Sequence, residues 1–353
     1  MLGKRDRAVL VVSILVIALA VAGGWWSGAL RPDTRPALTS AIDVLPASTT
    51  IVGFTDWAQI RETLEIGTVD TAGERDELTD ESAIRDLSTR SVIAEAGAMH
   101  EVLGWSAAEV DWEAYGQDRN GAAAVVRLDG SVSYDAIRSR LREAGYTQDG
   151  QVWSSTKRTG LPDIMAHVGF VPRQRLIVMS DTKARIPLML DVAAGRARSL
   201  AGNQAAADTA RVLAGSETVL MQGGTLGCET SAVGGGADKE QQARTAVERA
   251  GGLEPYLFSG RGLVDRGGSG FSAQRLVFAM TFESAAVASE QARVRERLAA
   301  GPFIGRFGQL EETVRLQTSA SDGPTLQMAF AHDPETDVFM TGLGPVLFAT
   351  CKV

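Results

Sequence analysis

The chain has 353 residues, of which 44% are apolar and 22% charged, and its formal net charge is −8. This composition excludes a collagen-like chain, a wholly disordered chain and a small protein built on many disulfides. Lysine and arginine form no stripe outside the N-terminus, and a nucleic-acid partner needs clustered cations, so we expect none. The length fits one large or two moderate domains.

The N-terminus carries the clearest signal. Residues 8–26 are apolar apart from Ser13, end on two tryptophans and follow a basic segment, residues 1–7. A membrane-spanning helix needs about 20 apolar residues, positive charge stays in the cytoplasm, and Trp prefers the interface. We therefore expect a cytoplasmic tail over 1–7, a transmembrane signal anchor over 8–26, and an extracytoplasmic body in the cell membrane.

A cleaved signal peptide is the alternative for this segment. Residues 18–20 and 20–22 both have the Ala-x-Ala pattern of a cleavage site, and cleavage there would give a secreted protein. Trp25 and Trp26 favour the uncleaved anchor. No cysteine follows the apolar run directly, which excludes a lipoprotein anchor.

The two cysteines agree with an extracytoplasmic location. Cys228 and Cys351 both follow the anchor, and an even count in an oxidising space predicts one disulfide. Two buried thiols are the alternative. The wide separation of the cysteines and the lack of a neighbouring histidine argue against a metal site.

A proline-containing segment, 27–41, predicts a linker. The body then divides into a first half over 42–232, a Gly- and Ala-rich seam over 233–252 with a charged, helical centre, and a second half over 253–353. In chain order we expect a strand at 50–54, a helix capped by Asp56, a surface loop at 65–80, a helix at 81–104 and a capping box from Ser106 to Glu109.

Further along, apolar periodicity predicts more strands and helices, and Asp149-Gly150 predicts a hairpin turn. The predicted strands are 122–128, 164–171, 175–180, 218–221, 277–282, 326–331 and 338–341. The predicted helices are 133–145, 183–194 and 204–213, together with one that ends at Gly301.

The order strand, helix, strands, proline turn, strand occurs twice. Residues 137–141 match 294–298, and Pro172 matches Pro334. Such a repeated order indicates duplication. We therefore expect an α+β fold with two related halves, each with mostly antiparallel strands and packed helices.

Two short segments carry a resemblance. Residues 45–49 (LPAST) lead into a strand and the Asp-capped helix, and residues 199–204 (SLAGNQ) lead into an Ala-rich helix. Residues 43–225 thereby resemble a family of uncharacterised, membrane-anchored bacterial envelope proteins of actinobacterial type. The resemblance implies a location and a fold, and no function comes with it.

Motifs for chemistry are sparse. His100, His167 and His332 stand apart, without the ligand spacing of a zinc site, and no acidic cluster has the EF-hand pattern. Phosphate loops and the G-x-S-x-G elbow are absent from the sequence. We expect no cofactor and no metal, but a Ser–His–Asp site assembled in space stays open.

Three tryptophans, Trp57, Trp105 and Trp112, offer either a partner surface or core packing. Taken together, these features predict an extracytoplasmic, non-catalytic binding or scaffolding component of the cell envelope. Its expected partners are the membrane, through the N-terminal helix, and envelope proteins, lipids or glycans. The alternative is an extracytoplasmic hydrolase with a Ser/His/Asp site.

Overall fold

The computed structural model describes residues 35–94, 99–155, 160–224, 228, 236–304, 308–336 and 346–351. The expected anchor, 8–26, lies outside these residues, and so does the expected strand 338–341. None of the described helices has the length and apolar character to cross a membrane. The chain divides into two compact units, Met1–Arg35 and Pro36–Val353, and the second contains every element below.

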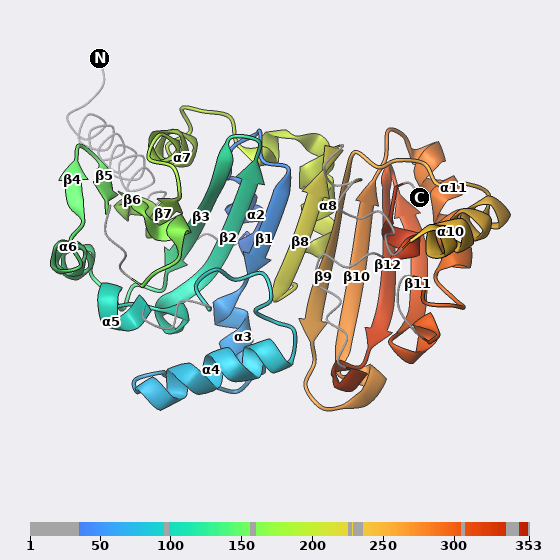
Figure 1. The fold of residues 1–353 in the computed structure, drawn as a ribbon, viewed down its shortest axis with the longest axis horizontal. Helices are drawn as coiled ribbons and strands as arrows, with labels where there is room; N and C mark the ends of the chain where they lie inside the picture. The colour runs from blue at the N-terminus through green and yellow to red at the C-terminus, as the bar shows by residue number, and fades with distance from the viewer. Residues whose placement is uncertain are drawn as a thin grey trace, which may run out of the picture. The chain divides into compact units, whose positions relative to one another are not determined.

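One antiparallel sheet of twelve strands organises the second unit (Figure 1). Its spatial order is β11-β12-β10-β9-β8-β1-β2-β3-β7-β6-β5-β4. The strands are β1 (Ile51–Thr55), β2 (Val110–Asp118), β3 (Gly121–Leu128), β4 (Thr147–Asp149), β5 (Val152–Ser154), β6 (His167–Val171), β7 (Leu176–Ser180), β8 (Thr218–Gly223), β9 (Phe258–Asp265), β10 (Gln274–Thr281), β11 (Val314–Asp322) and β12 (Thr325–His332).

Helices cover both faces of this sheet, which gives the α+β class that the sequence predicts. The helices are α2 (Ala37–Ile42), α3 (Trp57–Thr63), α4 (Ala72–Ile84), α5 (Met99–Leu103), α6 (Tyr134–Glu143), α7 (Arg185–Ala193), α8 (Gln204–Leu213), α10 (Ala237–Ala250) and α11 (Ala285–Leu298). Helices α2, α7 and α8 contribute to one core cluster, and the other helices contribute to the second.

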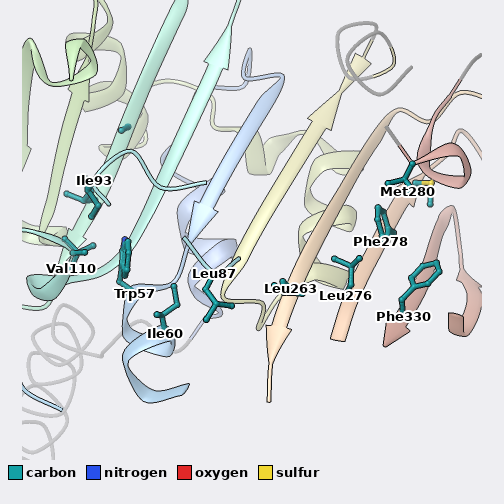
Figure 2. Packing of buried hydrophobic residues seen from close by; sticks show 14 of the residues in the cluster. Trp57, Ile60, Leu87, Ile93, Val110, Leu263, Leu276, Phe278, Met280 and Phe330 are labelled. Carbon is teal, nitrogen blue, oxygen red and sulfur yellow. The ribbon is translucent and has the colours of Figure 1, made fainter. Parts of the chain in front are cut away.

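Strand β10 shows how the two cores share the sheet. Side chains alternate along a strand: Phe278 and Met280 join the core under α11, while Val277 and Ala279 join the core under α8. Figure 2 shows the core under α11, which extends from Trp57 to the C-terminal strands. Both faces of the central strands are therefore buried under helices and their apolar side chains.

The strand order repeats on the two sides of the sheet. A hairpin, a helix and a second hairpin give the order β2-β3-β7-β6 around α6 and the order β9-β10-β12-β11 around α11, with β4 and β5 inserted after α6 in the first group alone. The matched segments 137–141 and 294–298 lie in these two equivalent helices. The expected match of Pro172 with Pro334 is wrong, because Pro172 lies between β6 and β7, whereas Pro334 follows β12.

The packed body begins earlier than the sequence predicts. The expected linker, 27–41, overlaps helix α2, whose Leu38 and Ala41 are buried against the sheet. Pro36 sits at the N-cap of this helix, where a proline is tolerated because the first turn needs no amide donor. The body therefore starts at residue 36, and not at 42.

The expected loop at 65–80 and helix at 81–104 are also wrong. Helix α4 begins after Thr71, which forms a capping box with Glu74, and ends at Ile84. Its sequence lacks the apolar stripe by which a helix is recognised, because only two of its side chains, Leu78 and Ser82, are buried in the structure. The segment after it leaves the helical conformation because its backbone binds Glu113, as described below.

The predicted disulfide is confirmed. Cys228 and Cys351 are bonded, with their Cα atoms 5.3 Å apart. Next to the bond, the ring of Phe348 lies 4.9 Å from that of Phe278, and the buried Arg295 donates to the carbonyls of Phe348 and Thr350 at 2.6 and 2.8 Å. These contacts hold the end of the chain against the core.

We expect Cys351→Ser to lower the free energy of unfolding by about 2–4 kcal/mol, because the bond closes a long loop in the unfolded chain. Chemical unfolding with and without reductant measures the difference. The double variant with Cys228→Ser is the control and should match the single variant. A wild-type protein that reductant does not destabilise would contradict this prediction.

Candidate functional site

The structure keeps the three histidines apart. His100 Nδ1 lies 3.5 Å from a carboxylate oxygen of Glu109, and His332 Nδ1 lies 2.7 Å from the amide oxygen of Gln274. His167 Nδ1 lies 2.8 Å from the hydroxyl of Ser154. Within the described part of the chain no cluster of His, Cys, Asp and Glu could hold a metal ion.

The tryptophans form no partner surface. Trp57, Trp105 and Trp112 are at most 3% exposed. Trp57 and Trp105 belong to one core, and Trp112 belongs to the other. Core packing, the alternative that the sequence left open, is therefore the correct interpretation of all three.

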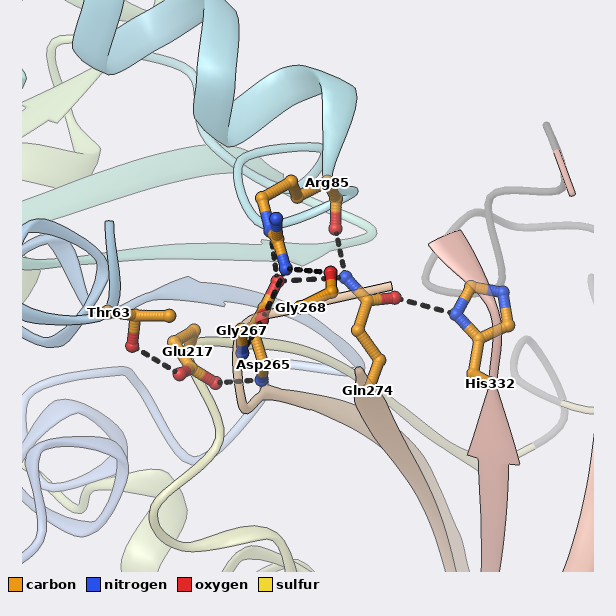
Figure 3. A network of polar contacts seen from close by, with 8 residues as sticks. All are labelled: Thr63, Arg85, Glu217, Asp265, Gly267, Gly268, Gln274 and His332. Carbon is orange, nitrogen blue, oxygen red and sulfur yellow. Dashed lines mark hydrogen bonds and ion pairs between the residues drawn. The ribbon is translucent and has the colours of Figure 1, made fainter. Parts of the chain in front are cut away.

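Polar side chains meet where β8 and β10 begin and β9 and β12 end (Figure 3). Arg85, just after α4, makes a bidentate ion pair with Asp265 at 2.5 and 2.8 Å. Gln274 donates to the Asp265 carboxylate and to the Arg85 carbonyl, and its amide oxygen meets His332. Burial alone would raise the pKa of Asp265, but hydrogen bonds from Arg85 and the Gly267 amide lower it overall. This network fastens α4 to the sheet.

A second buried carboxylate shapes the segment after α4. Glu113 on β2 accepts hydrogen bonds from the Ser91 hydroxyl at 2.5 Å, the Val92 amide at 2.7 Å and the Trp57 indole at 3.4 Å. These three donors satisfy the Glu113 carboxylate. The bond from the Val92 amide takes the place of a helical backbone bond in the segment after α4. Glu113 therefore positions this connection.

Burial raises the pKa of three carboxyls near α3. The pKa rises to about 6 for Asp56 and to about 7 for Glu113 and Glu217, in each case chiefly because the charged form loses its hydration. Glu217 accepts hydrogen bonds from the Thr63 hydroxyl and the Asp265 amide. Asp56 caps α3, Glu113 holds the segment after α4, and Glu217 joins α3 to the end of β9.

An open groove lies elsewhere, between the β4–β5 hairpin and α7. It has a volume of about 550 Å³, and its lining residues are Asp149, Gln151, Val152, Lys183, Ala184, Pro187 and Leu190. The hairpin forms where Asp149-Gly150 predicts it, but Asp149 ends β4 and pairs with Val152. Apolar side chains dominate the groove, and an exposed ion pair, Lys183 to Asp149 at 2.8 Å, joins its two walls.

The Ser154–His167 pair lies beside this groove. Ser154 follows Val152 by two residues on β5, so both side chains project from the same face. His167 is the cross-strand neighbour of Ser154, and burial, with the charge of Lys183, lowers the pKa of its imidazole. The pair therefore has a neutral base next to a hydroxyl.

The pair lacks the third member of a triad. Asp181, whose charge acts to raise the pKa of His167, accepts hydrogen bonds from the hydroxyls of Ser180 and Thr182 instead. Within the residues that the structure describes, His167 makes no hydrogen bond to a carboxylate. No sequence motif singles out Ser154, because only the register of β5 on β6 brings it to His167.

No family model and no curated protein matches the chain. Solved structures with some likeness include crystal forms I and III of TP0453, which are 9% and 10% identical in sequence. The alignments cover 88% and 86% of this chain and 99% and 94% of those chains, with TM-scores of 0.40 and 0.39. Likeness at this level decides neither fold nor function.

We expect the free energy of unfolding to fall as the pH rises from about 4.5 to 8. The folded protein keeps protons on Glu113 and Glu217 at a pH where the unfolded chain has released them. A rise from 4.5 to about 7 for Glu113 corresponds to roughly 3 kcal/mol between these limits.

Chemical unfolding at pH 5 and pH 8 measures this loss. Glu113→Gln should flatten the dependence, whereas Glu143→Gln, at an exposed position on α6, should leave it unchanged. A wild-type protein that is equally stable, or more stable, at pH 8 would show that the carboxyls are not protonated in the folded state.

Proposed function

We propose that this protein is a non-catalytic binding component of the bacterial cell envelope, anchored in the membrane by residues 8–26. The basic segment before the apolar run and the two tryptophans after it support this topology. The disulfide between Cys228 and Cys351 fits an oxidising space outside the cytoplasm. The resemblance carried by residues 45–49 and 199–204 is to anchored envelope proteins and supports the same location.

The observation that carries the binding function is the groove between the β4–β5 hairpin and α7. Val152 and Leu190 are each 7% exposed and, with Pro187, give it an apolar lining. Leu188, next to Pro187, is one of three large apolar side chains exposed in the described part of the chain. Ligand grooves combine such surfaces with a few polar groups, here the pair of Lys183 and Asp149.

Among envelope ligands, the lining favours a lipid over a glycan. A sugar presents hydroxyl groups, and hydroxyls placed against Val152, Pro187 and Leu190 would lose hydrogen bonds to water without replacement. An acyl chain loses nothing by this contact. The two related orders of strands support an origin of the body by duplication, with the groove in the first half.

Photo-crosslinking tests the groove in native membranes. We expect a benzophenone amino acid at Gln151, which lines the groove, to yield lipid adducts by mass spectrometry. The matched control is the same replacement at Gln241, which is exposed on α10. Lipid adducts of equal yield at both positions, or at neither, would refute a ligand in the groove.

A hydrolase is the second candidate, and the Ser154–His167 contact is the observation that favours it. In such an enzyme the Ser154 hydroxyl would attack an ester carbonyl while His167 takes its proton and later passes it to the leaving alcohol. Water would then release the acyl group. No carboxylate in the described part of the chain bonds to His167 and orients its imidazole, so we rank this function second.

Labelling with a fluorophosphonate separates the two candidates. We expect no modification of Ser154 and no turnover of esters by the intact protein. Ser154→Ala and, as the matched control, Ser139→Ala at an exposed position on α6 should therefore behave like the wild type. Labelling that Ser154→Ala abolishes and Ser139→Ala retains would establish the hydrolase.

A further inference from the structure

Strand β11 ends the sheet with an open edge (Figure 1). Among the strands that the structure describes, its nine residues pair only with β12, and six of them are exposed. An edge strand presents unpaired amide and carbonyl groups to any extended chain that approaches it. The length of β11 makes this edge a ready template for another strand.

The uncharged part of this edge has only a bulge as protection against pairing. Proteins block such edges with lysine, proline or very short strands. The opposite edge, β4, has only three residues, and Asp149 at its end is engaged with Lys183. In β11 the residues from 316 to 321 carry no charge and include no proline. Its one irregularity is a bulge between Leu316 and Thr318.

Two opposite charges bracket the uncharged stretch, on one face of the sheet. Arg315 lies opposite Ala331, and Asp322 lies opposite Thr325. Because Ala331 and Thr325 are six residues apart on β12, they share a face, and so do their partners. The ring of Phe271 holds the Arg315 guanidinium, 3.7 Å from its centroid.

This arrangement is complementary to itself. Consider a second β11 placed antiparallel to the first, with the two-fold axis at Ser319. The bulge between Leu316 and Thr318 leaves residue 317 without a ladder position of its own, so Arg315 and Asp322 each lie three positions from Ser319. Arg315 therefore stands opposite Asp322 of the partner subunit, and the two-fold axis repeats this pair. Every uncharged residue between them meets an uncharged residue.

We propose that β11 is a homodimer interface, in which two copies of this chain join their sheets edge to edge through an antiparallel β11–β11 pair. The backbone hydrogen bonds supply the attraction, and the two Arg315–Asp322 pairs fix the register. The occupant of the edge is thus a second copy, in preference to an unrelated extended segment, because the sequence of β11 itself places both charges opposite their complements.

A charge-swap cycle tests the dimer on the full-length chain in detergent. Light scattering on a size-exclusion column and sedimentation give the protein mass and the dissociation constant of the unaltered chain, which should be dimeric. Arg315→Glu or Asp322→Arg alone places like charges opposite each other at two symmetric points and should weaken dimerisation about tenfold. The double variant R315E/D322R should restore it.

Arg173→Glu, at an exposed position away from β11, is the matched control and should leave the dimer intact. Thermal unfolding confirms that each variant is folded. A monomeric wild type at every concentration would overturn the proposal. So would single variants that dimerise normally, a double variant that is not rescued, or an R173E variant that is weakened as much as R315E.

Discussion

The pairing of β1 with both β2 and β8 is the constraint on which the rest of the body depends. Ile51 lies opposite Gln117 on one side and opposite Gln222 on the other, so five residues join two groups of strands into one sheet. The junction is closed at its end by the Asp56 amide, which donates to the Glu217 carbonyl at 2.7 Å. Because helices cover both faces here, the carboxyls of Asp56, Glu113 and Glu217 are largely buried, and burial raises their pKa values.

The sequence predicts the elements whose signal is local. Helix α8 occupies residues 204–213 as expected, because Asn203 caps it and its buried residues repeat at helical spacing. The disulfide is predicted from the even number of cysteines and from their expected extracytoplasmic location. Strands β2, β9 and β11 were missed because polar residues interrupt their apolar patterns. In β2 the interruption is Glu113, whose burial depends on donors more than 20 residues away along the chain.

The candidate site was beyond the sequence for a similar reason. The groove needs the β4–β5 hairpin and α7 to lie side by side, although Val152 and Leu190 are far apart along the chain. The Ser154–His167 contact needs the register between β5 and β6. Conversely, the tryptophans were ambiguous because an indole suits both an interface and a core. Burial on a sheet with two covered faces decided in favour of the core.

The proposed function requires an anchored body outside the cytoplasm, with its binding surfaces facing the envelope. Protease treatment of intact spheroplasts tests this most directly, with detection of the body in washed membranes and in the medium. We expect the chain to stay with the membranes and external protease to degrade the body while a cytoplasmic marker survives. A body that is released into the medium, or that is protected until the spheroplasts are lysed, would contradict it.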